Sequence, residues 1–192
     1  MTYDTRQVTH GTEQVAFSGG SENQPIYSTG VSSFSPSVDQ DSKKVYADAR
    51  THITLMNAKS ETIEISNYQY NAGELAQMGY TEINGGFIDV GSYQVFDVQR
   101  ILTVQKEDGS TTERLEVYYG CTSSDYTESD DEDEDEINPK IYTRTLTVAG
   151  KDFETYGHVT KFVIERTEEN AKSFDAYKTK IMEPSDFQSV TG

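Results

Sequence analysis

The stretch DVQRILTVQKEDGSTTERLEVYYG (residues 97–120) predicts a β-hairpin and, with it, the class of fold. Two runs of alternating apolar and polar residues flank the dipeptide Asp108-Gly109, a preferred pair for a tight hairpin turn. Side chains on one face of a strand recur at every second residue. We therefore assign Ile101 and Leu115 to the core, one on each arm, and expect Arg100 and Glu116 to point outward.

The same period-two pattern recurs on both sides of this hairpin, so the chain is predicted to be mainly β. In ETIEIS (61–66), Ile63 and Ile65 share one face of the strand and Glu64 takes the other. The periodic segments are rich in Thr, Val, Ile and Tyr, which suit a half-buried pleated surface. The other predicted strands are KVYADA (44–49), HITLM (52–56), KIYTRTLTVAG (140–150) and GHVTKFVIERT (157–167).

One short helix is expected within NAGELAQMG (71–79). Asn71 can cap it, Glu74 can close a capping box three residues later, and Gly79 can end it. A helix this short is not stable alone, so we expect it to pack on the sheet. A second helical pattern lies near the C-terminus and ends before Pro184; its apolar residues are Ala171, Phe174, Tyr177 and Ile181.

Polar segments divide the chain. Residues 1–42 are low in apolar residues, and SSFSPSVDQDS (32–42) is typical of a loop. TEINGGFIDVGS (81–92) contains two adjacent glycines and is expected to be a turn-rich link. A polar segment as long as 1–42 is usually functional or disordered, and we expect it to become ordered against a neighbouring subunit. The predicted division is a polar arm or loop (1–42), a β domain (43–167) and a C-terminal extension (168–192).

Net charge restricts the partners of this chain. Its 192 residues include 33 Asp and Glu but only 16 Lys and Arg, which gives a formal charge of −17. Affinity for DNA comes mostly from Lys and Arg that neutralise phosphates, so the chain should repel DNA and anionic membranes. The sequence shows neither a long apolar run nor a secretion-signal pattern, so we expect no membrane span and synthesis in a cytoplasm.

An acidic loop is expected at CTSSDYTESDDEDEDEINP (121–139). Its seven consecutive carboxylates, Asp130 to Glu136, invite comparison with a calcium-binding EF-hand loop, but the ligand pattern does not fit. If Asp125 takes position one, then Asp130 takes position six, where the sharp turn needs glycine. Carboxylates in one solvated run also share one environment, so they do not form an acid–base pair.

No residue pattern indicates catalysis, cofactor binding or metal binding. His10, His52 and His158 are far apart and lack metal-ligand spacing. The single cysteine, Cys121, follows a strand without a companion motif and is expected to be buried. The sequence also lacks the common phosphate-binding, dinucleotide-binding, serine-hydrolase and zinc-protease motifs. We therefore predict a structural protein, not an enzyme, with no catalytic, cofactor-binding or metal residues.

The order of local sequences resembles that of the major tail proteins, or tail tube proteins, of siphophages. The resemblance covers residues 44–153. It rests on VYADARTHITLMNAKSETIEI, on the capped helix in YQYNAGELAQMGY, on the Gly-Gly-Phe-Ile-Asp turn, and on the pair LEVYYGC and IYTRTLTVAG. In that family a "YAD" strand precedes sheet strands and a short helix that ends in "LGY" or "MGY". A hairpin, a polar acidic loop and a Thr-rich strand follow.

This resemblance implies a tail-tube fold, which is a β-sandwich or barrel flanked by a short α-helix, and a place in a bacteriophage virion made in the host cytoplasm. It implies hexameric rings that stack into a hollow tube and that contact tape-measure, tail terminator and tail-tip proteins. Viral DNA would pass the lumen without specific binding. Carboxylates would repel phosphates within a Debye length of about 8 Å. We expect the polar faces of 98–119 and 140–149 to line this lumen, and the run 125–136 to lie outside the wall.

Two other interpretations fit the same sequence. The first is another virion subunit of tail-tube fold, such as a terminator, a tip component or the tube of a contractile injection system. The second is a carbohydrate-binding β-sandwich or adhesin module, which predicts exposed aromatic residues along a groove and a stable monomer. Electron microscopy of concentrated protein separates these classes, because only a tube protein should form rings or tubes with an open lumen.

Overall fold

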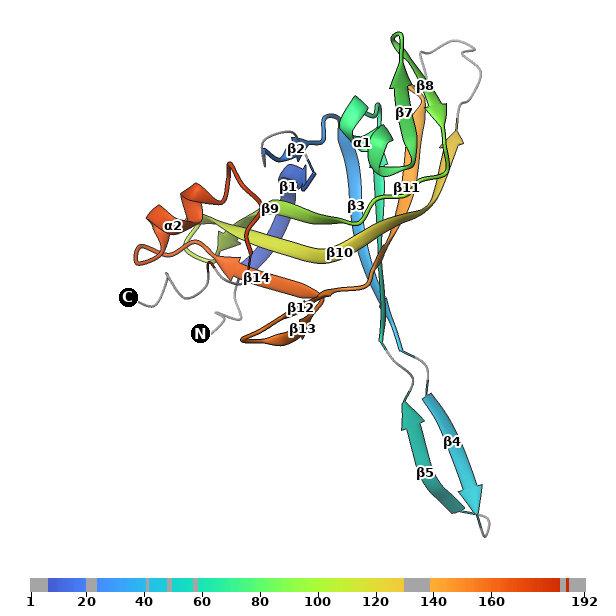
Figure 1. Cartoon of the computed structure of the whole chain (residues 1–192). Helices are drawn as coiled ribbons and strands as arrows, with labels where there is room; N and C mark the ends of the chain where they lie inside the picture. Colours follow the sequence, from blue (N-terminus) through green and yellow to red (C-terminus); the bar gives the residue numbers. More distant parts are fainter. Residues whose placement is uncertain are drawn as a thin grey trace, which may run out of the picture.

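A large antiparallel sheet forms the centre of the protein (Figure 1). The computed structural model describes residues 7–19, 24–40, 42–47, 50–56, 59–129, 139–183 and 186. The strand order is β2-β1-β9-β10-β11-β6-β3, and β14 pairs with β10 as a branch. The strands are β1 (Gln7–Phe17), β2 (Ile26–Tyr27), β3 (Val31–Asp39), β6 (Ser60–Asn67), β9 (Phe96–Lys106), β10 (Thr111–Ser129), β11 (Ile141–Val148) and β14 (Lys161–Glu165).

The predicted central hairpin is confirmed as β9–β10. Leu115 lies directly opposite Ile101, and both side chains are buried. In the connecting turn the Asp108 carboxylate accepts a hydrogen bond of 2.8 Å from the Ser110 amide, and Gly109 has a positive φ of 82°. This turn chemistry joins two strands of opposite direction within a few residues.

Strand β10 belongs to both halves of the sheet. Residues 111–118 pair with β9, and within them 114–118 also pair with β14, whereas from Cys121 onward β10 pairs with β11. The change of partner coincides with a register shift between Tyr118 and Cys121. Gly120 lies in this bend with a φ of 62°, and a Cβ at this position would collide with the backbone of Gly150. The bend therefore requires glycine.

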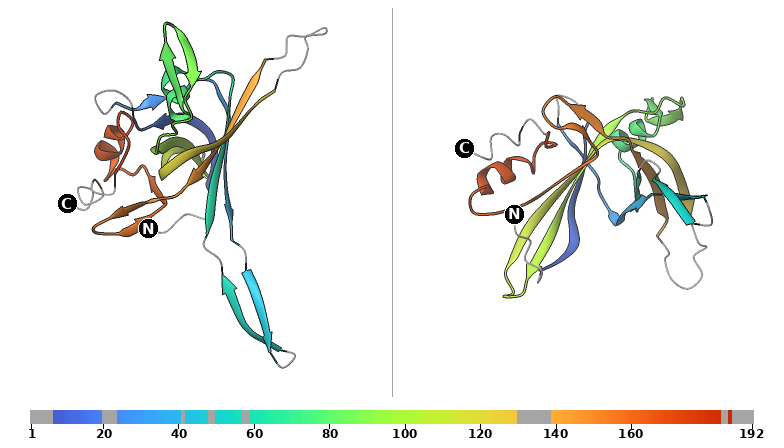
Figure 2. Two further views of the ribbon diagram at one scale, coloured as in Figure 1. Left: turned by 45° about the vertical axis from the view of Figure 1, so that its right-hand side comes forward. Right: turned by 90° about the horizontal axis from the view of Figure 1, so that it is seen from below.

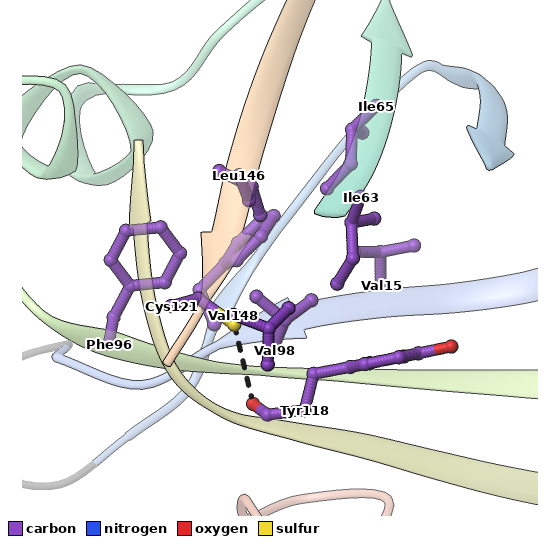
Figure 3. Packing of buried hydrophobic residues seen from close by; sticks show 10 residues of the cluster. Val15, Ile63, Ile65, Phe96, Val98, Tyr118, Cys121, Leu146 and Val148 are labelled. Carbon is purple, nitrogen blue, oxygen red and sulfur yellow. Dashed lines mark hydrogen bonds between the residues drawn. The ribbon is translucent and has the colours of Figure 1, made fainter. Parts of the chain in front are cut away.

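The two halves of the sheet enclose the first hydrophobic core (Figures 2 and 3). The alternation predicted for residues 61–66 is confirmed, because Ile63 and Ile65 are buried in this core and Glu64 is exposed. Burying one such side chain contributes about 1.5–3 kcal/mol. The members of this core are Val15, Phe17, Ile63, Ile65, Phe96, Val98, Tyr118, Cys121, Leu146 and Val148.

A second core lies on the opposite face of β9, β10 and β14, under helix α2 (Ala171–Ala176). Phe174 and Tyr177 are buried there, which confirms the apolar stripe of the second predicted helix. The helix is shorter than predicted and ends at Ala176. The Gln99 amide donates hydrogen bonds to the carbonyls of Tyr177, at 2.6 Å, and Lys180, at 3.1 Å, so a side chain of the sheet satisfies backbone groups just past the helix end. Pro184 lies outside the described residues.

Helix α1 (Ala72–Gln77) is confirmed together with its capping box. The Asn71 side chain accepts a hydrogen bond of 2.9 Å from the Glu74 amide, and the Glu74 carboxylate accepts one of 3.1 Å from the Asn71 amide. Gly79 follows the helix with a φ of 96°, which suits the left-handed turn that ends it.

In the described part of the chain, three hairpins lie outside the main sheet. The pair β4 (Ser42–Ala47) and β5 (Arg50–Met56) confirms two predicted strands and extends far from the sheet at the lower end in Figure 1. The pair β7 (Tyr80–Ile83) and β8 (Gly86–Asp89) rises at the opposite end. The third pair is β12 (Lys151–Phe153) and β13 (Gly157–Val159).

Several expectations for the polar segments were wrong. The predicted loop at 32–42 contains most of β3, which pairs with β6 along its whole length. The predicted link at 81–92 contains a hairpin, whose turn uses Asn84 and Gly85 with φ values of 52° and 80°. The single strand predicted at 157–167 is split into β13 and β14. Whether residues 1–42 act as an arm in assembly stays a prediction.

Candidate assembly surfaces

One face of the second half of the sheet carries mainly hydroxyl side chains. Register places Ser35 opposite Glu64, Glu64 opposite Thr145, and Thr145 opposite Asp125, so these four strands present one continuous face. Within β3, β6, β11 and residues 122–129, no Lys or Arg occupies a position of this face. We call it the hydroxyl face; its described side chains are Ser33, Ser35, Ser37, Asp39, Ser60, Thr62, Glu64, Ser66, Thr122, Thr127, Ile141, Thr143, Thr145 and Thr147.

The four strands under this face have two open edges. In the described part of the chain β3 pairs only with β6, and β10 beyond its register position with Phe96 pairs only with β11. Unpaired edges present rows of backbone donors and acceptors to another chain. Pro36 sits within β3, and proline without an N–H is tolerated where the amide position points away from the neighbouring strand. Because the four strands alternate in direction, the two edge strands are antiparallel to one another.

Behind the hydroxyl face, a buried ion pair fixes α1 to the sheet. Arg144 and Glu74 are both fully buried, with 3.1 Å between Nη2 and Oε1. Glu74 also accepts hydrogen bonds from the Ser28 hydroxyl at 2.6 Å and the Asn67 amide at 3.1 Å. Burial lowers the pKa of the Arg144 guanidinium, and the facing Glu74 carboxylate opposes this shift. The guanidinium lies 4.3 Å from the centre of the Phe17 ring.

Arg100 and Glu116 were predicted to point outward, and this is wrong. They do lie on the face opposite Ile101 and Leu115, but Phe34 of β3 and the Lys161 side chain of β14 cover them there. The guanidinium stacks on the Phe34 ring at 4.4 Å and donates to Glu116 at 2.8 Å, while Lys161 reaches the same carboxylate at 3.3 Å. Burial favours a raised pKa for Glu116, but Arg100 and Lys161 outweigh it and hold the pKa below its usual range.

The cysteine and the histidines considered in the sequence do not form a common site in the structure. Cys121 is buried as predicted, and burial raises the pKa of its thiol well above the usual value. His10 and His158 are exposed on β1 and β13, and His52 lies on the separate hairpin strand β5. The structure does not bring these residues together.

The loop predicted at 121–139 was wrong in its first half, because β10 continues as a strand to Ser129 and pairs with β11. The consecutive carboxylates that follow lie outside the described residues, which stop at Ser129 and resume at Pro139. At the border of this acidic run Glu128 pairs with Lys140 at 2.9 Å. Among the described residues there is no group of three or more His, Cys, Asp or Glu side chains that could hold a metal ion. The described helices are also all too short and too polar to cross a membrane.

The described strands leave two open sheet edges, and open edges are sites at which β proteins pair with other chains. The family model described as phage tail tube protein matches residues 1–191. The chain therefore belongs to the phage tail tube protein family and is a structural virion component, not an enzyme.

Solved structures of low sequence identity are also similar to the chain. A chain of the sheath–tube complex of an extracellular contractile injection system in its extended state is 11% identical, with a TM-score of 0.45 over 80% of this chain and 88% of that chain. A chain of the tube-terminating cap of the anti-feeding prophage is 11% identical, with a TM-score of 0.46 over 79% and 88%. No curated protein matches the chain.

Proposed function

We propose that this protein forms the phage tail tube as stacked hexameric rings, with the hydroxyl face turned toward the lumen. The observation that supports this proposal is the four-stranded unit β3-β6-β11-β10, which combines a face free of cations with two antiparallel open edges. DNA binds proteins chiefly through Lys and Arg, so a wall of hydroxyls and scattered carboxylates lets it slide without being held.

The open edges suggest how neighbouring subunits join. β3 of one copy can pair with the distal part of β10 in the next copy, because these strands are antiparallel. The unit has an even number of strands that alternate in direction, so copies repeated around a ring meet through antiparallel strands at every contact. The contact is head-to-tail, and such a contact forms a ring when its rotation closes. The polar face of β11 faces the lumen, as predicted for 140–149. Thr127 of β10 shares this face, so in this proposal the first part of the run 125–136 belongs to the wall, unlike the position outside the wall that we expected for it. Arg100 and Glu116, on the face of 98–119 that was also expected to line the lumen, do not line it, because they are covered within the subunit.

The contacts between rings and with other tail proteins complete the proposed assembly. The β4–β5 hairpin extends beyond the sheet at one end (Figure 1). We assign it to ring stacking. The tape-measure protein would occupy the lumen before DNA, and terminator and tip proteins would cover the two ends of the tube. In this proposal the protein is made in the host bacterial cytoplasm and DNA passes through its tube at ejection.

The lateral contact is tested at Val38. Val38 has the same strand parity as Pro36, so its amide is expected to point away from β6 toward the neighbouring copy. The Val38→Pro variant should remain folded by circular dichroism but form neither rings nor tubes in electron micrographs, while Val38→Ala should assemble like the wild type. Normal tubes from Val38→Pro would contradict pairing through β3. A wild-type chain that stays monomeric at high concentration and binds glycans saturably would contradict the tube itself.

A further inference from the structure

The β7–β8 hairpin and the segment after it leave an unusual amount of apolar surface exposed. All residues from 81 to 95 are exposed. Large patches of apolar surface on a soluble chain mark interaction sites, whereas scattered apolar residues do not. Six large hydrophobic residues fall within this segment, namely Ile83, Phe87, Ile88, Val90, Tyr93 and Val95.

The hairpin has two chemically different faces. Register pairs Thr81 with Ile88 and Ile83 with Gly86, so Ile83 and Ile88 share one face with no charged residue. We call it the aliphatic face. The opposite face carries Tyr80, Glu82, Phe87 and Asp89, including two carboxylates. A strand that alternates in this way is adapted to burial on one side only.

The hairpin turns its charged face toward its own subunit. The Tyr80 hydroxyl lies 2.6 Å from the Tyr126 hydroxyl on β10, and their ring centres are 6.4 Å apart. Tyr80 belongs to the charged face, so the aliphatic face looks away from β10. Tyr126 is the register partner of buried Arg144, so the hairpin stands behind the hydroxyl face. A two-stranded hairpin on its own is at best marginally stable in water, so burial of the aliphatic face would add to its stability.

We propose that the aliphatic face of the β7–β8 hairpin docks on the neighbouring copy of the same chain, in the same ring, outside the tube wall. This inference rests on the proposed function. Charge favours a second copy at this place: a chain of net charge −17 repels its copies wherever carboxylates meet, and the aliphatic face has none. The hairpin also contacts β10 at Tyr126, within the part of that strand whose open edge receives the neighbour's β3, so both contacts reach the same copy.

The experiment compares two variants of the full chain. The double variant Ile83→Ser/Ile88→Ser removes the aliphatic face. Phe87→Ser is the matched control, because it removes an exposed apolar side chain of the same hairpin from the other face. We expect the double variant to need at least about tenfold more protein for assembly and to remain monomeric below that concentration, because burying two isoleucines is worth more than the ~1.4 kcal/mol of a tenfold change. Phe87→Ser should assemble at a protein concentration within about twofold of that of the wild type. As monomers, the wild type and both variants should unfold at similar temperatures.

A second readout does not depend on loss of assembly. In the Ile88→Cys variant the introduced thiol is exposed, while the native Cys121 is buried and does not compete. A maleimide should label the introduced thiol in the monomer and fail to label it in rings. Rings or tubes in which this thiol is fully reactive would overturn this proposal and leave the proposed function standing. If the double variant forms rings that do not stack, the hairpin lies between rings, which would contradict its assignment to a contact within one ring. A wild-type chain that never associates would contradict both proposals.

Discussion

Arg144 of β11 and Glu74 of α1 form an ion pair that is completely shielded from water, although 70 residues separate them in the chain. It ties the helix to the strand whose other side presents Thr143 and Thr145. The wall that we assign to the lumen therefore depends on a charge interaction on its hidden side. Removal of one charge leaves the other buried without compensation, which is more costly than loss of an exposed pair.

The first prediction concerns this pair. Glu74→Gln should lower the free energy of unfolding by about 3–5 kcal/mol, measured by chemical denaturation, because it leaves the Arg144 guanidinium buried without a counter-charge. Arg166 and Asp175 form an exposed pair at 2.9 Å and serve as the control. Arg166→Met should cost less than about 1 kcal/mol. Equal effects at the two sites would show that the buried pair does not anchor α1.

The second prediction concerns the bend of β10. Gly120→Ala should destabilise the fold by at least about 3 kcal/mol, because the new methyl group meets the Gly150 backbone and the residue has a positive φ. Gly109 has a similar φ of 82° but open space around it. Gly109→Ala should cost only about 1–2 kcal/mol. Thermal or urea unfolding of the two variants measures the difference in stability. Equal losses of stability would show that the close approach of the Gly150 backbone does not matter.

The third prediction concerns pH. Both ring nitrogens of His158 face acceptors, the Asp152 carboxylate at 2.8 Å and the Ala149 carbonyl at 2.9 Å. The Asp152 hydrogen bond and then the Ala149 bond raise the pKa of His158 above its ordinary value of 6.5. A raised pKa in the folded state stabilises the fold fully below the unfolded pKa, and that contribution disappears as pH rises through the folded pKa. Asp152→Asn should bring the His158 pKa, followed by NMR, back toward 6.5; an unchanged value would contradict the contact.

The fourth prediction concerns the hydroxyl face. Thr147 is exposed, and its register neighbours are Thr62 and Thr122, so a lysine there has no carboxylate directly beside it. Tubes of Thr147→Lys should assemble, but particles that contain them should eject DNA more slowly, with the delay reduced by added salt. Thr147→Gln should behave like the wild type, and Tyr156→Lys, an exposed position away from this face, should also eject normally. Normal ejection from Thr147→Lys would argue against a lumen position.

Local patterns predicted the parts of this fold that depend on neighbouring residues. The alternation of Ile63, Glu64 and Ile65 identified a strand and its inner face, and the spacing of Asn71 and Glu74 identified a capped helix. β3 was missed because its serines and Pro36 are typical of a loop. It is a strand because β6 supplies a partner and because proline is tolerated at a sheet edge.

The assembly surfaces depend on contacts that a single segment does not reveal. The alternating pattern correctly placed Arg100 and Ile101 on opposite faces of β9. It could not show that Phe34, far along the chain, would cover the face that carries Arg100. The hydroxyl face likewise appears only when four strands are placed in register. Arg144 carried a usable signal, because it shares strand parity with the buried Leu146, and an arginine at an inward position calls for an acidic partner.

An electron cryomicroscopy reconstruction of the assembled wild-type chain would show whether the hydroxyl face lines the tube. We expect sixfold rings in which β3 of each copy pairs with β10 of the next and in which Thr143, Thr145 and Thr147 point into the lumen. A tube with these threonines on its outer surface, or one in which β3 remains unpaired, would contradict this expectation.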